Sequence, residues 1–180
     1  MSITTKTGDK KTSRFFSGEE AMKDDLRFET YGTLDELVAH LGLARSFIEH
    51  KNLSQDVRDL QVELFRLGGE LATTDPDKLQ WIKPTSKEHV QNLEEKMQAY
   101  EGEIKLPHSF LIPGAANASA ALEVARTVSR RLERRMVAMA NKDLLNNENA
   151  LVYINRVSDY CFLLARMVEF YDGVPFDAKD

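Results

Sequence analysis

The residues of this sequence most able to do chemistry fall into two basic clusters. The first is the loop TKTGDKKTS, from Thr5 to Ser13, in which a glycine lies among hydroxyl and lysine side chains. Backbone amides in a turn of this kind can bind an anion. The second is a run of arginines between Arg126 and Arg135, and the planar guanidinium group suits phosphate oxygens. The formal net charge is −5, so the clusters predict a small anionic ligand and not a general nucleic-acid partner.

The arginine run has a helical pattern with two arcs. Beside an apolar arc, a charged arc holds Arg126, Arg130, Glu133 and Arg134. One interpretation is a solvated face, on which each Glu–Arg pair contributes a few tenths of a kcal/mol. Four of the residues 130–135 are arginines that repel one another, however, and a surface built only for solubility would mix its charges better. A phosphate-bearing ligand is therefore the alternative to a solvated face.

A second polar arc is predicted in the last helical segment, where the recurring residues are Asn155, Asp159, Phe162 and Arg166. This pattern is typical of a solvated face or of a polar seam between subunits. Asn155 and Ser158 are mediocre helix formers, which favours a specific hydrogen-bonding role for this arc.

Several kinds of catalytic site are missing from the sequence. The four histidines do not have metal-ligand spacing, and no Glu-x-x-His pair of a di-iron bundle is present. There is no Walker A motif, no serine elbow and no pair of cysteines. We therefore predict no protein metal site, and an enzyme on this chain would act by positioning ligands and stabilising charge.

Helical periodicity indicates the helices that position these residues. We predict helices from Thr33, with Glu36 completing a capping box, from Ser54 to about Thr73–Pro76, and after Pro84, with a capping box of Thr85 and Glu88. Two more run from about Ala118 to Asn141 and from Glu148 to Tyr171, after a break at Leu106–Asn117 (LPHSFLIPGAAN). The prediction is an all-α fold, a single domain of residues 1–180 made of a five-helix bundle over residues 33–171 and an irregular arm over residues 1–32.

The arm is longer than most loops of a compact domain. It carries apolar residues, namely Phe15, Phe16, Leu26, Phe28 and Tyr31, so we expect it to fold back on the bundle or on a neighbouring subunit. No stretch approaches the roughly 18 apolar residues of a membrane helix, and the N-terminus does not have the apolar core of a secretory signal. With a lone cysteine, Cys161, the sequence predicts a cytoplasmic protein without a membrane partner.

Six blocks in order resemble the ATP:cob(I)alamin adenosyltransferases of the PduO type. They are TKTGDK at Thr5–Lys10, KDDLRFETYGTLDEL at Lys23–Leu37, LQVELFRLGGELAT at Leu60–Thr73, SFLIPG at Ser109–Gly114, VARTVSRRLER at Val124–Arg134 and INRVSDYCFLLAR at Ile154–Arg166. The resemblance covers most of the chain and keeps the order of the family's motifs.

The resemblance implies a five-helix bundle that assembles as a homotrimer with active sites between subunits. Its implied reaction is attack of cob(I)alamin on the ribose C5′ of ATP, which gives adenosylcobalamin and triphosphate. This fits a chain without a catalytic base, because cobalt is the nucleophile and the cofactor carries the difficult step. Mg²⁺ on the triphosphate is implied too, together with a reductase that supplies cob(I)alamin and an adenosylcobalamin-dependent enzyme as partners.

The resemblance also implies a role for single residues. The triphosphate would be cradled by Thr5, Lys6, Thr7, Gly8, Ser13 and Lys23. The ATP site would be completed from a neighbouring subunit by Arg130, Arg131, Glu133, Arg134 and Asn155. Asp35 would pair with Arg126 to support the cobalamin pocket, and Phe110 would crowd the lower face of the corrin, keeping the lower axial ligand off cobalt.

Three residues depart from the family pattern. Lys11 stands where the family usually has glycine, Ala115 replaces the second glycine of a PGG sequence, and Val157 replaces a customary leucine. If the backbone at Lys11 needs a positive φ, a lysine is strained there. The departures at Lys11 and Ala115 leave two other functions open: an ATP- or cobalamin-binding carrier or regulator without turnover, and a purely structural helical oligomer with basic seams.

Overall fold

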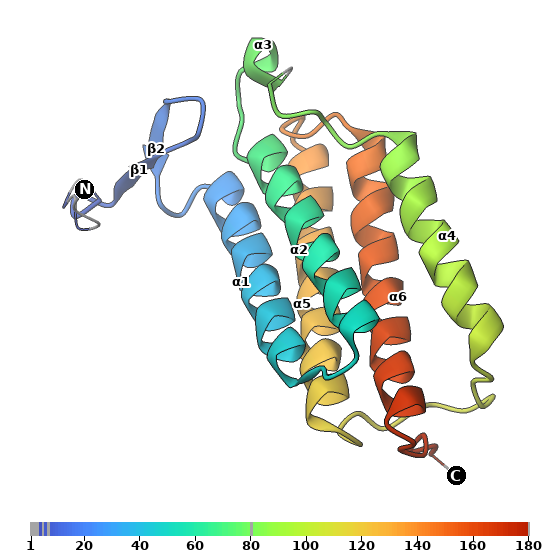
Figure 1. Cartoon of the computed structure of the whole chain (residues 1–180). Helices are drawn as coiled ribbons and strands as arrows, with labels where there is room; N and C mark the ends of the chain where they lie inside the picture. The colour runs from blue at the N-terminus through green and yellow to red at the C-terminus, as the bar shows by residue number, and fades with distance from the viewer. Residues whose placement is uncertain (1–3, 5, 7, 80, 180) are drawn as a thin grey trace.

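The computed structural model describes residues 4, 6, 8–79 and 81–179. Five long helices make up most of it: α1 (Leu26–Phe47), α2 (Lys51–Leu71), α4 (Lys87–Glu103), α5 (Asn117–Ala140) and α6 (Glu148–Tyr171). A one-turn helix, α3 (Pro76–Leu79), lies between α2 and α4. Figure 1 shows the long helices side by side, running alternately up and down. The predicted five-helix bundle is confirmed.

The predicted apolar stripes meet in one core. α1 packs against α2 and α5, and α6 packs against α5, α4 and α2. Leu37 of α1, Leu64 of α2, Leu132 of α5 and Leu164 of α6 are fully buried in this core. Truncating one such leucine to alanine costs about 2–5 kcal/mol in proteins generally. The apolar residues that recur with a helical period therefore also hold α5 and α6 in place.

Three helices begin elsewhere than the sequence predicted. α2 starts at Lys51, three residues before the predicted Ser54. α1 starts at Leu26 and not at Thr33, because the Asp25 carboxylate caps it by accepting a hydrogen bond from the Arg27 amide at 2.8 Å. Thr33 is inside the helix, where its hydroxyl donates to the Glu29 carbonyl at 2.7 Å, a bond that a helix-internal threonine can make. The capping residue of α4 is Ser86 and not Thr85, and Ser86 is paired with His89. Thr85 is buried and donates both its amide and its hydroxyl to Glu70.

The arm over residues 1–32 was predicted to be irregular, and this was wrong for residues 12–14 and 20–22, which form strands, and for residues 26–32, which belong to α1. Strands β1 (Thr12–Arg14) and β2 (Glu20–Met22) form an antiparallel hairpin, which projects to one side of the bundle near the start of α1 (Figure 1). Strands of three residues are too short to produce a recognisable alternation.

The hairpin is anchored to the bundle at its turn. Phe15 is buried and stacks on Phe28, with ring centroids 4.5 Å apart. The Lys78 ammonium donates to the Ser17 carbonyl at 2.6 Å, and the Ser17 and Thr74 hydroxyls are 2.8 Å apart. The prediction that the arm folds back on the bundle is confirmed for these residues.

At the opposite end of the bundle, the chain after α6 returns to the break between α4 and α5. Leu111 and Ala178 form an antiparallel bridge. The Ile112 amide donates to the Asp177 carbonyl at 2.7 Å, and the Lys179 amide donates to the Phe110 carbonyl at 2.8 Å. In the described part of the chain, no helix is both long and apolar enough to cross a membrane.

Candidate functional site

Lys23 lies beside Gly8 of the N-terminal loop. A Cβ atom added to Gly8 would lie 3.0 Å from the Lys23 ammonium nitrogen, a tight contact from which the end of the lysine side chain would have to shift slightly. The Lys23 amide donates to the Lys11 carbonyl at 2.9 Å, which closes the loop on the start of β1. Ser13 lies in β1 opposite Ala21. Lys6 is exposed with a φ of 59°, and Thr5 and Thr7 lie outside the described residues.

Lys11, which stands where the family usually has glycine, adopts a backbone conformation with positive φ. Its φ is 66°, in the left-handed region where an L-residue with a Cβ atom costs roughly 1–2 kcal/mol. The side chain is exposed. The loop therefore keeps the turn that glycine would make, with some strain and with one additional positive charge.

The arginine run is divided between two sides of α5. On the side of α1, Arg131 forms an ion pair with Glu36 and Arg135 forms one with Glu29. Both arginines line a groove between α1 and α5 that also contains Gly32 and Thr33. The carboxylates of α1 thus neutralise two of the five arginines of the run within one chain.

On the side of α6, a cavity of about 350 Å³ lies between α5 and α6 near the end of α4. Its lining includes Arg126, Arg130, Asp159 and Phe162. Arg130 is exposed, and its guanidinium makes no hydrogen bond or ion pair with any described residue. The Arg134 guanidinium donates to the Arg130 carbonyl at 3.0 Å. These two arginines keep charge available for a ligand.

Glu133 and Asn155 were both predicted to be site residues, and the structure brings them together. The Asn155 amide nitrogen donates to the Glu133 carboxylate at 2.8 Å, and the Asn155 amide oxygen accepts from Arg156 at 2.8 Å. This contact joins α5 to α6 one turn away from Arg130. The Glu133 carboxylate, which lies between the arginines of α5, thus holds α6.

Arg126 does not pair with Asp35 within one chain. Its Nε donates to the Glu123 carboxylate at 2.6 Å, while Asp35 is exposed on α1. The reason is geometric, since Arg126 lines the α5–α6 cavity and Asp35 belongs to a helix on the other side of α5. A pair between Asp35 and Arg126 stays a prediction for two copies of the chain.

Phe110 has 87% of its surface exposed, on the loop that the chain after α6 holds in place. A phenylalanine so exposed is available for contact with a large apolar ligand. Gly114 in the same loop has a φ of 125°, a conformation that other residues rarely adopt. Ala115 is partly buried at the end of the turn.

Two acidic residues behind the α5–α6 cavity were not predicted from the sequence. Glu123 and Glu169 are buried beside Arg166, and burial raises the pKa of Glu169. An acidic residue on the buried face of an apolar helix gives no periodic signal, because the pattern predicts only an apolar residue there. Cys161 is fully buried, and burial raises the pKa of its thiol to about 12, so it is not a nucleophile.

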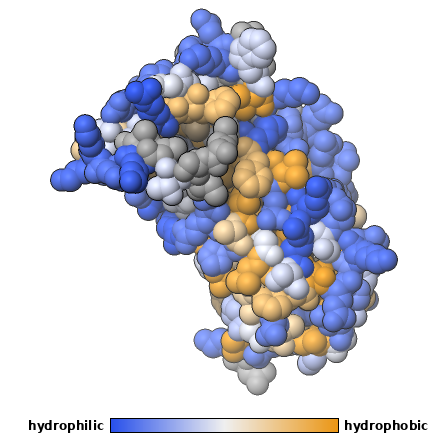
Figure 2. Space-filling view, turned by 60° about the vertical axis from the view of Figure 1, so that its left-hand side comes forward, coloured by the Kyte–Doolittle hydropathy of each residue, from blue (hydrophilic) through white to orange (hydrophobic). Residues whose placement is uncertain are grey.

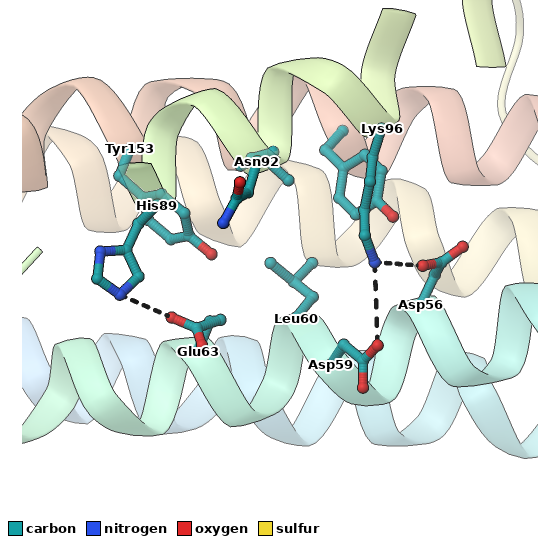
Figure 3. Close-up of a pocket in the computed structure, with 10 residues that line it drawn as sticks. Asp56, Asp59, Leu60, Glu63, His89, Asn92, Lys96 and Tyr153 are labelled. Atoms are coloured by element: carbon teal, nitrogen blue, oxygen red, sulfur yellow. Dashed lines mark hydrogen bonds and ion pairs between the residues drawn. The ribbon is translucent and has the colours of Figure 1, made fainter. Parts of the chain in front are cut away.

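A further cavity of about 120 Å³ lies between α2 and α4 (Figure 3). The Lys96 ammonium reaches across it to Asp56 at 2.5 Å and to Asp59 at 3.9 Å, and His89 lies 3.8 Å from Glu63. Its lysine and histidine thus lie opposite its carboxylates, and it contains none of the predicted site residues.

The chain is similar to proteins of known name over nearly its whole length. A family model described as Cobalamin adenosyltransferase matches residues 3–168. A corrinoid adenosyltransferase of Citrobacter freundii is 41% identical over 170 residues, which cover 93% of this chain and 94% of the relative. The human corrinoid adenosyltransferase MMAB is 34% identical over 176 residues, covering 95% of this chain and 70% of the relative.

Solved structures give the same result. A variant of the PduO-type ATP:corrinoid adenosyltransferase from Lactobacillus reuteri, complexed with cobalamin and ATP, superposes with a TM-score of 0.91 at 33% identity, covering 99% of this chain and 96% of the other. Another variant of the same enzyme, complexed with ATP, has a TM-score of 0.90 at 32% identity and covers 99% of this chain and all of the other (100%).

Proposed function

We propose that this chain, which belongs to the cobalamin adenosyltransferase family, transfers the 5′-deoxyadenosyl group of ATP to the cobalt of cob(I)alamin. The observation that carries the proposal is the family match over residues 3–168, together with an arginine, Arg130, that has no partner among the described residues and lines a cavity. A carrier without turnover is not favoured, because the relatives are named for the transferase activity over nearly the full chain.

The reaction needs little acid–base chemistry from the protein. The electron pair of cob(I)alamin forms the new cobalt–carbon bond at C5′, and the C5′–oxygen bond breaks with its electrons going to triphosphate. The protein must then align cobalt with C5′ and stabilise the charge on the leaving group. The guanidinium and ammonium groups of the chain can stabilise that charge. The raised pKa of the buried Cys161 thiol agrees with a reaction in which the protein supplies no nucleophile.

The triphosphate is expected to lie between the N-terminal loop and the free arginines of α5. The loop would contribute its backbone amides with Lys6 and Lys23, and Arg130 and Arg134 would contribute guanidinium donors. Gly8 supports this role, because a Cβ atom in its place would lie 3.0 Å from the Lys23 ammonium nitrogen and crowd it. We expect Mg²⁺ to be held by the triphosphate oxygens, since no group of three or more His, Cys, Asp or Glu in the described residues could hold a metal ion.

A site between two copies of the chain would join the two sets of residues. In one chain, the loop and Lys23 make no hydrogen bond or ion pair with Arg130, Arg134 or Asn155 among the described residues. Two different faces that meet head to tail generate a ring when the rotation between copies closes, and a homotrimer is the ring that we propose.

The surface of α1 and α5 supports this assembly. These helices expose apolar side chains, namely Leu43, Phe47, Val124 and Val137. The side of the molecule that carries the hairpin also shows apolar side chains gathered among hydrophilic ones beside and below the arm (Figure 2). A ring would cover part of this surface.

The corrin is expected at the other end of α5. Phe110 would lie against its lower face and exclude the lower axial ligand, which makes Co(II) easier to reduce. Asp35 of one copy would reach Arg126 of the next at the edge of the same pocket. We expect the protein to work in the cytoplasm with a reductase and with an adenosylcobalamin-dependent enzyme that takes its product.

The test is anaerobic mixing of the protein with ATP, Mg²⁺ and chemically reduced cob(I)alamin. We expect adenosylcobalamin and triphosphate in equal amounts. Tight ATP binding without product, with verified cob(I)alamin, would instead support a carrier or regulator. Failure to bind ATP at all would support a structural oligomer.

A further inference from the structure

Three charged side chains are buried together behind the α5–α6 cavity. Arg166 and Glu169 are each 1% exposed, and Glu123 is 5% exposed. A guanidinium nitrogen of Arg166 lies 3.0 Å from Glu169 and 3.4 Å from Glu123. Residues of these types are almost never fully buried unless they are paired.

The buried arginine reaches the cavity by two routes. Glu123 accepts a hydrogen bond from the Nε of Arg126 at 2.6 Å, so the same carboxylate touches both arginines. The Arg166 guanidinium carbon also lies 5.1 Å from the centroid of the Phe162 ring. Both Arg126 and Phe162 line the α5–α6 cavity. Arg166 itself is behind this wall and is not among the lining residues.

Stability is a poor reason for this arrangement. The Nε of Arg166 and one carboxylate oxygen of Glu169 are buried without a hydrogen-bond partner. A buried ion pair of this kind loses hydration on folding, and well-packed apolar residues in its place are often neutral or stabilising. Fixed charges can instead hold neighbouring side chains in a single orientation, which a binding wall requires.

We infer that Arg166 is a positioning residue of the corrinoid pocket. It holds Arg126 by way of Glu123, and it holds Phe162 by direct contact with that ring. The inference rests on the proposed function. In it, Arg166 touches neither substrate. It sets the direction of the Arg126 guanidinium, which the proposed function places at the edge of the corrinoid pocket, and of the Phe162 ring, which lines the same cavity as Arg126.

The central experiment replaces the buried pair together, as Arg166→Met with Glu169→Leu. This double variant keeps the core apolar and leaves Glu123 paired with Arg126. We expect its melting temperature to stay at or above that of the parent. Cob(II)alamin should bind at least tenfold more weakly to the ATP-loaded protein, measured by anaerobic absorbance titration. The affinity for ATP, measured by calorimetry, should change less than twofold.

A second variant tests the link through Glu123. Glu123→Gln keeps the shape of the side chain but removes the charge that joins Arg166 to Arg126, and we expect a smaller loss of cob(II)alamin affinity than in the double variant. If the double variant does not fold, this one decides the question. An unchanged cob(II)alamin affinity would then overturn the inference.

The matched control is Arg66→Met on α2, which removes a partly buried arginine that bonds to Glu63, Lys83 and Thr85 away from the cavity. It should lower stability and leave both affinities unchanged. If the double variant behaves like this control, Arg166 is structural only and the inference fails. Failure of the proposed function looks different, because the parent protein itself would then make no adenosylcobalamin.

Discussion

Replacing Lys11 by glycine should tighten the N-terminal loop. The φ of Lys11 is 66°, and the left-handed conformation costs an L-residue roughly 1–2 kcal/mol. Glycine relieves that strain but adds conformational freedom to the open loop, and this freedom cancels about 0.4–1 kcal/mol of the relief. The net expectation is about 0.5–1 kcal/mol in favour of the closed loop, or about a two- to fivefold change in its opening equilibrium.

The Lys23 amide is the probe for this change. It donates to the Lys11 carbonyl at 2.9 Å, and it is far enough along the chain for its intrinsic exchange rate to be unaffected by the substitution. A surface hairpin opens without global unfolding, so native-state hydrogen exchange measures the loop where a melting curve would not. Exchange of this amide should slow about two- to fivefold in Lys11→Gly.

Two matched variants separate strain from charge. Lys10→Gly makes the same substitution at a neighbour that is not among the residues with positive φ, so it should speed exchange. Lys11→Ala removes the charge but keeps the strain and should not slow exchange. Equal acceleration in Lys11→Gly and Lys10→Gly would refute the reasoning, because it would mean that no strain is stored at Lys11.

Three further expectations follow from the site and its anchors. Arg130→Ala should lower kcat/KM by about 10- to 150-fold, which corresponds to a charged hydrogen bond of about 1.5–3 kcal/mol, with an unchanged melting temperature. An undiminished rate would remove Arg130 from the site. Deleting residues 174–180 removes the backbone bonds from Asp177 and Lys179 to the Phe110 loop, so the Ile112 amide should exchange about tenfold faster, with a raised KM for the corrinoid. An unchanged exchange rate would mean that the loop is rigid by itself. Hydrogen bonds from Ser17 and Thr74 lower the pKa of Glu19 to about 2. A lowered carboxyl pKa stabilises the folded hairpin above the ordinary value of 4.5 and loses this contribution as the pH falls towards 2. The protection of the hairpin amides, measured as their exchange rate relative to the intrinsic rate at the same pH, should therefore fall in that window in the parent and much less in Glu19→Gln.

The helical core could be predicted from the sequence, because a helical period needs only the identity of residues three and four apart. The helix from Glu148 to Tyr171 was predicted at both ends, and the one observed from Asn117 to Ala140 was predicted within one residue. The start of α1 was not, since Thr33 and Glu36 look like a cap while the true cap, Asp25, precedes a run with few helical markers. A cap depends on which amides are free, and that is decided by packing of the preceding turn.

The sequence predicts candidate site residues but not how they are arranged. The contact of Glu133 with Asn155 joins two blocks that were both predicted. The pair of Arg126 with Glu123 could not be predicted from a charged arc, because Glu123 lies on the buried side of α5. The direction of a side chain relative to a neighbouring helix depends on the crossing of the two helices, which a single sequence does not give.

The arginine run shows why charge alone does not locate a ligand. Four arginines within residues 130–135 looked too repulsive for a solvated face. The structure resolves half of that repulsion with carboxylates of α1, since Glu36 and Glu29 pair with Arg131 and Arg135. Only Arg130 and Arg134 remain without a carboxylate partner among the described residues. The excess charge is therefore two guanidinium groups one helical turn apart. A triphosphate spans that distance, so these two arginines are where substitution should affect turnover more than stability.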